Sequence, residues 1–118
     1  MNCVNRKGFI AIQEDDDLIR DLLERWLWEA GYSLRAAAGE APRLVIADIP
    51  SPRGAQSCIE ALRRVYAAPI LVLSGRFRRG LAGSAEAARR LGVKKVLPKP
   101  FTRKELLLAV DEALEGSA

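Results

Sequence analysis

"LVIAD", residues Leu44 to Asp48, is a run of four apolar residues that ends in a carboxylate, in a chain of 118 residues. An unbroken apolar run of this length is typical of a strand that is buried on both faces of a sheet. Strands of that kind occur in parallel sheets, in which a crossover helix usually joins one strand to the next. The run therefore predicts an α/β fold, and it raises the question of why a buried strand ends in Asp48.

The sequence on either side repeats this alternation of strand and helix. Apolar runs predict further strands at 9–12, 69–74 and 93–97, and a weaker strand at 32–37. Helical spacing predicts a helix that carries residues 18–27 and is stopped by Gly31, and three more near 55–65, 84–91 and 102–114. Thr102 and Glu105 form a capping-box pattern for the last of them. Together the elements predict an open, parallel, five-stranded, doubly wound sheet with helices on both faces.

Composition and length indicate one globular domain. Apolar residues make up 49% of the chain and charged residues 29%, and no apolar run approaches the about 18 residues of a membrane span. The first ten residues lack the apolar core of a secretory signal, so we expect a cytoplasmic protein without membrane contact. The chain has no histidine, and Cys3 and Cys58 follow no ligand pattern, which excludes zinc sites and histidine acid–base chemistry.

Charge is distributed unevenly along the chain. Residues 76–104 contain ten basic residues and one acid, so this segment carries +9 while the whole chain carries +4. Such a segment could meet nucleic acid or an acidic protein surface, although solvated helix faces are the commoner explanation. We rank nucleic-acid binding last, because only Phe77 and Phe101 are interleaved with the charges as possible stacking residues.

Polar side chains follow four of the expected strands. Glu14 and Asp15 follow the first, Asp48 ends the third, Ser74 ends the fourth and Lys99 follows the fifth. The carboxyl ends of parallel strands meet at one edge of the sheet, which is where ligands bind in such folds. Three carboxylates would need a shared cation, and hard oxygen ligands favour Mg²⁺. A carboxylate beside Mg²⁺ is a plausible nucleophile toward phosphorus.

Each of these residues also has an ordinary structural explanation. The acids at 14–17 could favour a helix N-terminus, by well under about 1 kcal/mol each. Asp48 could be a turn residue, Ser74 could simply end a strand, and Lys99 could lie in a plain loop between two prolines. The chemical interpretation is preferred because all of these explanations would otherwise have to coincide.

The motifs that carry these residues resemble the receiver domain of bacterial response regulators, a flavodoxin-like fold. They are QEDDDLIRDLL (13–23), LVIADIPSP (44–52), ILVLSGR (70–76) and VLPKPF (96–101), and they span nearly the whole chain. The resemblance implies that Asp48 is the phosphoacceptor for a histidine kinase or phosphotransfer protein, with Ser74 and Lys99 contacting the phosphoryl group. The implied Mg²⁺ ligands are Glu14, Asp15, Asp48 and the backbone carbonyl of Pro50.

Two features depart from the family pattern. Val96 stands three residues before Lys99, where receivers commonly carry an aromatic residue that changes rotamer on activation. The segment between Asp15 and Asp48 is also about ten residues short, and the six residues from Ala38 to Arg43 span at most ~20 Å when extended. We therefore predict that the second helix is shortened or missing, so that one face of the sheet exposes apolar side chains suited to a protein contact.

These features define the expected role. We expect one receiver domain at 8–116, an N-terminal extension at 1–7 and no output domain. Such a domain would not be an enzyme beyond self-catalysed phosphotransfer and dephosphorylation, and would signal by phosphorylation-dependent binding to a protein target or to itself. The alternative, suggested by Val96 and the missing helix, is a degenerate receiver that acts as a phosphorylation-independent dimerisation or scaffold module.

Overall fold

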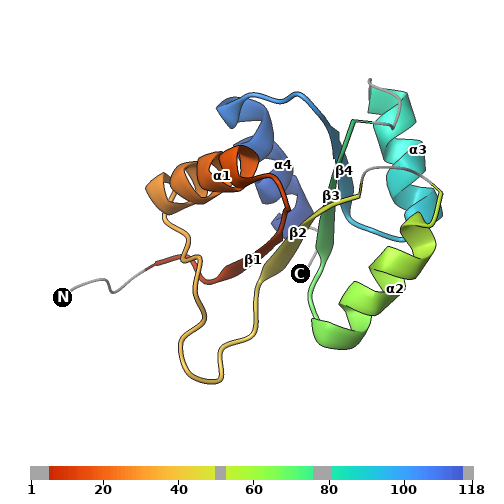
Figure 1. Cartoon of the computed structure of the whole chain (residues 1–118). Helices are drawn as coiled ribbons and strands as arrows, with labels where there is room; N and C mark the ends of the chain where they lie inside the picture. The colour runs from red at the N-terminus through yellow and green to blue at the C-terminus, as the bar shows by residue number, and fades with distance from the viewer. Residues whose placement is uncertain (1–5, 50–52, 76–80, 116–118) are drawn as a thin grey trace.

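The computed structural model describes residues 6–49, 53–75 and 81–115 (Figure 1). Pro50, and the arginine-rich loop that contains Arg76, Arg78 and Arg79, lie outside these ranges. Within them, no helix is long and apolar enough to cross a membrane.

Strands and helices alternate along the described chain. The strands are β1 (Ile10–Gln13), β2 (Leu44–Asp48), β3 (Ile70–Ser74) and β4 (Lys95–Pro98); the helices are α1 (Asp17–Glu29), α2 (Ala55–Val65), α3 (Leu81–Leu91) and α4 (Arg103–Glu115). All three strand pairs are parallel, and the strands lie in the sheet in the order β1-β2-β3-β4. The predicted parallel α/β fold is confirmed, although α3 begins three residues earlier than expected.

The prediction of a fifth strand at 32–37 was wrong, because the described sheet has four strands. Only one bridge remains of the expected strand: Ser33 pairs with Phe9, and its carbonyl accepts a hydrogen bond of 2.9 Å from the amide of Ile10. Past Leu34 the sequence is Arg-Ala-Ala-Ala-Gly, and small residues of low β propensity give this segment little to bury against the sheet. The chain therefore leaves the edge of β1 after a single bridge.

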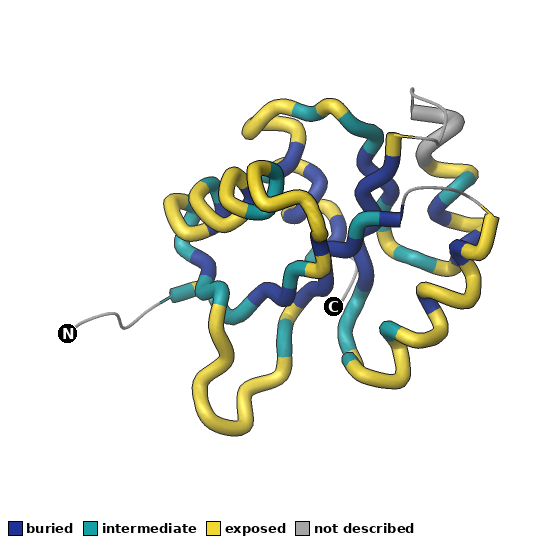
Figure 2. Tube along the Cα trace, viewed as in Figure 1, coloured by how far each residue is buried: buried dark blue, intermediate teal, exposed yellow. Residues whose placement is uncertain are grey.

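Alternate residues of the strands supply two separate cores, one on each face (Figures 1 and 2). The core under α1 and α4 includes Leu23, Leu27, Leu44, Ile46, Leu71, Leu73, Leu106 and Val110. The core under α2 and α3 includes Val45, Ile49, Ala55, Ile59, Val72, Leu91 and Val96. Each fully buried aliphatic side chain contributes roughly 1.5–3 kcal/mol, so these cores outweigh any cap or ion pair in stabilising the fold. From its helical spacing, the sequence of α2 predicts that Cys58 is buried together with Ile59 and Leu62, but Cys58 is exposed.

Helix ends follow the capping chemistry of the sequence. Asp16 is the N-cap of α1 and accepts hydrogen bonds from the amides of Leu18 and Ile19. Gly31 ends α1 with φ +106°, a conformation that side chains rarely adopt. The capping box of α4 is confirmed by reciprocal bonds of 2.8 and 3.0 Å between Thr102 and Glu105.

The C-terminal end of α1 has no basic residue in its last turn, and the N-terminal segment supplies one. Arg6 donates hydrogen bonds to the carbonyls of Trp28 and Tyr32, and its guanidinium lies 3.5 Å from the centroid of the Trp28 ring. A cation at this position interacts favourably with the negative end of the α1 dipole. Trp28, which remains 54% exposed, is therefore a contact residue for the chain's own Arg6.

The link between α1 and β2 contains no helix; all of its residues are described. Residues 35–41 of this link form an exposed loop, in which the amide of Glu40 donates a hydrogen bond of 2.9 Å to the carbonyl of Ala37 (Figure 2). That the family's second helix has been lost here stays a prediction. In this structure, no helix lies between Gly31 and the start of β2.

This loop predicts a specific pattern of amide hydrogen exchange. Amides in 35–42, where Pro42 has none, should exchange at nearly unprotected rates, because one turn with exposed hydrogen bonds opens easily, whereas amides of β2 and β3 should exchange only through global unfolding. Exchange followed by NMR on the intact chain checks this. Protection in 35–42 equal to that of β2 would instead reveal a regular element that the structure does not contain.

Candidate functional site

The carboxyl ends of the four strands form one edge of the sheet, and the residues selected from the sequence lie along it. Glu14 follows β1, Asp48 ends β2, Ser74 ends β3 and Lys99 follows β4. After β1 the chain enters α1 on one face, and after β2 it enters α2 on the other face (Figure 1). A crevice forms between two such strands, and Glu14 and Asp48 stand on its two sides.

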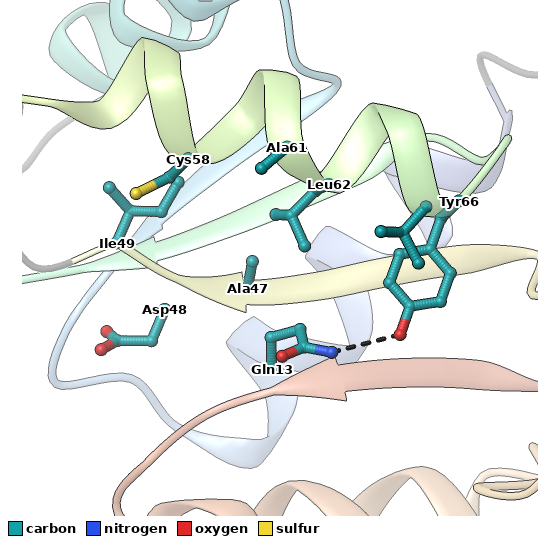
Figure 3. A pocket seen from close by; sticks show the side chains of 9 residues that line it. Gln13, Ala47, Asp48, Ile49, Cys58, Ala61, Leu62 and Tyr66 are labelled. Carbon is teal, nitrogen blue, oxygen red and sulfur yellow. Dashed lines mark hydrogen bonds between the residues drawn. The ribbon is translucent and has the colours of Figure 1, made fainter.

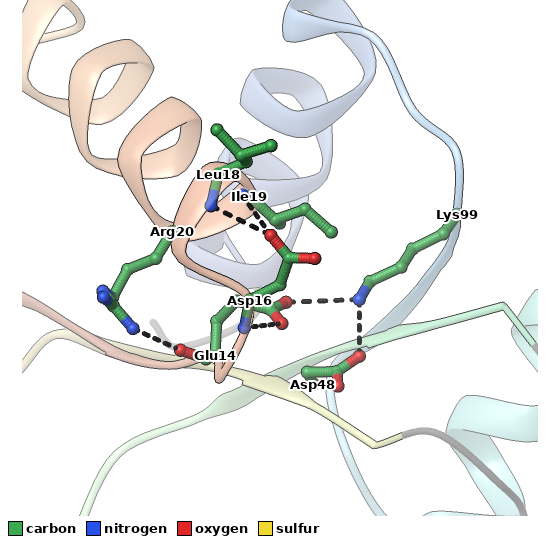
Figure 4. A network of polar contacts seen from close by, with 7 residues as sticks. All are labelled: Glu14, Asp16, Leu18, Ile19, Arg20, Asp48 and Lys99. Atoms are coloured by element: carbon green, nitrogen blue, oxygen red, sulfur yellow. Dashed lines mark hydrogen bonds and ion pairs between the residues drawn. The ribbon is translucent and has the colours of Figure 1, made fainter.

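Lys99 joins the two sides of this crevice (Figure 4). Its ammonium lies 2.7 Å from Oδ1 of Asp48 and 3.2 Å from Oε1 of Glu14. The side chains of Lys99 and Asp48 are each 22% exposed, and that of Glu14 is 2% exposed. One cation therefore bridges a buried carboxylate and a carboxylate that solvent can reach.

Two opposing effects set the pKa of Lys99. Partial burial lowers it, but hydrogen bonds and charge attraction from Asp48 and Glu14 outweigh burial and leave the pKa raised above its ordinary value. A raised lysine pKa means that the stabilisation from this ion pair is fully present below the pKa of the unfolded chain, and is lost only when the pH rises through the folded value. Lys99 therefore stays charged at neutral pH.

The acidic residues at 14–17 lie partly in the crevice and partly at the start of α1. Glu14 points into the crevice, and its Oε2 accepts a hydrogen bond of 3.1 Å from the amide of Asp16. Asp16 caps α1, while Asp17 pairs with Arg20 on the helix surface. Asp15 is exposed. The structural explanation from the sequence thus holds for Asp16 and Asp17, whereas Glu14 pairs with Lys99 in the crevice and its role as a metal ligand stays a prediction.

Arg20 was missed by the sequence reasoning. It donates a hydrogen bond of 2.9 Å to the backbone carbonyl of Glu14 and so links the first turn of α1 to the loop that carries the site. The signal was present, since Asp17 and Arg20 have the i, i+3 spacing of a helical ion pair.

Ser74 is buried at the end of β3 and lies beside the loop that carries Lys99. Its carbonyl accepts a hydrogen bond of 3.0 Å from the amide of Lys99, and its residue exposure is 0%. This backbone hydrogen bond therefore fixes the position of the Lys99 backbone relative to β3. Of the five predicted strand-end residues, the structure joins Glu14, Asp48 and Lys99 through side chains and Ser74 through backbone.

The donor side chains of the crevice decide whether it can hold a cation. Among the described residues, no three carboxylate, cysteine or histidine side chains gather closely enough to hold a metal ion. The carboxylates of Glu14 and Asp48 do converge, but Asp15 is exposed and Pro50 is outside the described ranges. Two convergent oxygen donors fit a hard cation such as Mg²⁺, and the remaining ligands would have to come from Asp15, the backbone and water.

This geometry is suited to one kind of chemistry. Asp48 presents a carboxylate that solvent can reach, and Lys99 pairs with its Oδ1. A carboxylate can attack an electrophilic phosphorus, and an adjacent ammonium can take up the negative charge of the transferred group. The chain has no histidine, and among the described residues the only cysteine, Cys58, lies on α2 and contacts neither Glu14 nor Lys99 in the ion-pair cluster.

Comparisons with known proteins point to the same family. No family-level sequence model matches the chain. The transcriptional regulatory protein PdtaR of Mycobacterium tuberculosis is 35% identical over 119 residues, covering 89% of this chain and 56% of PdtaR. Protein PetR of Rhodobacter capsulatus is 33% identical over 116 residues, covering 89% of this chain and 48% of PetR. The chain thus spans about half the length of these curated relatives.

A solved structure agrees over the full domain. The response regulator receiver protein from Burkholderia phymatum has a TM-score of 0.67 and 25% identity, and the match covers 92% of this chain and 96% of that one. The shared fold agrees with the sequence resemblance. The chain is therefore a receiver domain of the response-regulator family.

Proposed function

We propose that this domain receives a phosphoryl group on Asp48 and signals by binding another protein when it is phosphorylated. The observation that carries the proposal is the position of Lys99, whose ammonium contacts both Asp48 and Glu14 at the open edge of the sheet. A lysine held there neutralises the carboxylate before transfer and can contact phosphoryl oxygens after it. The donor would be a phosphohistidine of a histidine kinase or phosphotransfer protein.

In the proposed transfer, an oxygen of Asp48 attacks phosphorus, and the bond from phosphorus to the donor histidine nitrogen breaks. The electron pair of that bond stays on the imidazole, which takes up a proton from solvent. Lys99 moves from Oδ1 of Asp48 toward the phosphoryl oxygens, and Ser74 lies one strand away as a further hydroxyl. Positioning and electrostatics supply most of the rate in such transfers, so no further acid or base is needed.

Mg²⁺ would supply charge neutralisation between the carboxylates and the incoming phosphoryl group. Asp48 and Glu14 are already convergent, and the proposal adds the exposed side chain of Asp15 and the carbonyl of Pro50 as ligands. Because Asp15 lies at the solvent edge, its side chain can turn toward Asp48 without disturbing a core.

A second candidate is a domain that binds a partner or a second copy without phosphorylation. The observation that favours it is Val96, which is 1% exposed and packs in the core under α2 and α3. A buried valine cannot swing outward as an aromatic switch residue would, so any phosphorylation signal must be read elsewhere on the domain.

The phosphoacceptor role is tested by incubating the chain with Mg²⁺ and acetyl phosphate and measuring its intact mass. We expect one phosphoryl adduct, which Asp48→Asn abolishes because the amide is a poor nucleophile. Asp111→Asn, an exposed acid on α4, is the matched control and should retain the adduct. An adduct that survives in Asp48→Asn would place the phosphoacceptor elsewhere.

The role of Lys99 is tested by replacing its charge. Lys99→Met should slow adduct formation on the order of 100-fold, the usual cost of removing one charge-stabilising donor from a transition state. Lys104→Met, at an exposed position of α4, should leave the rate unchanged. Equal rates for Lys99→Met and the native chain would remove the ammonium from the mechanism.

The proposed cation site is tested by comparing two neighbouring acids. Removal of Mg²⁺ with EDTA should stop adduct formation, and Asp15→Asn should raise the Mg²⁺ concentration needed for half-maximal rate by about tenfold or more, since one charged ligand is lost. Asp17→Asn removes a nearby carboxylate that pairs with Arg20 and should have little effect. The same Mg²⁺ dependence in both variants would exclude Asp15 as a ligand.

A further inference from the structure

The loop between β1 and α1 carries two acids of the proposed cation site and is very short. It consists of three residues, Glu14, Asp15 and Asp16. At its β1 end a second anchor lies one residue earlier, where the amide of the Gln13 side chain donates a hydrogen bond of 3.1 Å to the Tyr66 hydroxyl (Figure 3). Asp15 is exposed, so the backbone on either side of it decides where its carboxylate points.

Arg20 fixes the peptide unit that joins Glu14 to Asp15. Its Nη1 donates a hydrogen bond of 2.9 Å to the backbone carbonyl of Glu14 (Figure 4). A peptide unit is planar, so a carbonyl that is held in place also fixes the amide of the next residue, which here is Asp15. Because Arg20 lies in the first turn of α1, this bond ties the backbone that leads into Asp15 to the helix.

The charge of Arg20 and its hydrogen bond act on a bound cation in opposite directions. The guanidinium is itself a cation, held against the loop that carries two proposed ligands, so its charge repels a metal ion. The side chain of Arg20 is 37% exposed, and solvent and salt weaken this repulsion. The hydrogen bond to Glu14 instead keeps the loop in one arrangement. Loss of the charge would therefore strengthen cation binding, and loss of the bond would weaken it.

We propose that Arg20 is a positioning residue for the cation site. Its bond to the Glu14 carbonyl keeps the backbone of Asp15 in the arrangement from which the Asp15 carboxylate can turn toward a divalent cation at Asp48. The inference rests on the proposed function, in which this cation assists phosphoryl transfer. Groups that orient a metal ligand contribute to metal affinity without contacting the metal, and Arg20 would do so through a backbone carbonyl.

The test is a titration of Mg²⁺ into the isotopically labelled intact chain, without acetyl phosphate, in which NMR follows the amides of the loop. Arg20→Gln should raise the Kd for Mg²⁺ by about tenfold, the lower end of the usual cost of losing a group that orients a metal ligand. Arg20→Lys keeps the charge and one donor, and should recover part of the affinity. Arg25→Gln removes an exposed cation from the same helix and should bind Mg²⁺ as the native chain does.

The outcomes separate this inference from the proposed function. A Kd for Arg20→Gln equal to or below that of the native chain would overturn the positioning role, and so would a native chain that binds no Mg²⁺. Intact mass after addition of acetyl phosphate tests Asp48 on the same samples. An adduct on the native chain, with unchanged Mg²⁺ affinity in Arg20→Gln, rejects only the role of Arg20. Weaker Mg²⁺ binding in that variant, with no adduct on the native chain, rejects only the phosphoacceptor role.

Discussion

The ammonium of Lys99, held between Asp48 and Glu14, is the interaction on which the site depends. Ion pairs at this level of exposure contribute little net stability, because desolvation of the charges offsets much of their attraction. The aliphatic cores, at roughly 1.5–3 kcal/mol for each buried side chain, stabilise the fold without them. Stability alone therefore does not explain why two acids and a lysine form a partly buried cluster. The parallel sheet makes the cluster possible, since it brings three residues distant in sequence to one edge.

The short link before β2 has effects at two levels. At the level of the fold, it leaves β1 at the edge of a four-stranded sheet, joined to Ser33 by a single bridge. At the level of the surface, its residues 35–41 form an exposed loop. If Asp48 is phosphorylated, the signal would have to be read without an aromatic switch, because Val96 is buried in the core under α2 and α3.

Much of this arrangement could be predicted from the sequence, for identifiable reasons. Continuous apolar runs such as Leu44 to Ala47 are typical of strands buried on both faces, and the ends of parallel strands converge at one edge of the sheet. The fifth strand failed because Tyr32 and Leu34 look like a strand, while pairing required further apolar residues that the alanine run does not provide. The sequence could not show which of the acids at 14–17 belong to the helix start and which to the crevice. The N-cap position of Asp16 and the crevice position of Glu14 both depend on where α1 begins. Cys58 was placed wrongly because a buried and an exposed apolar side of α2 have the same helical period.

The proposed phosphoacceptor role depends most directly on what surrounds Asp48 once it carries a phosphoryl group. A crystal structure of the chain with Mg²⁺ and beryllofluoride, which mimics a phosphoryl group on a carboxylate, would show this at the level of atoms. We expect a beryllofluoride group on an oxygen of Asp48. The ammonium of Lys99 should have moved from Oδ1 of Asp48 into hydrogen-bond distance of a fluorine. Beryllofluoride bound to another carboxylate, or an ammonium of Lys99 still paired with Asp48 and Glu14 in a fully bound site, would contradict it.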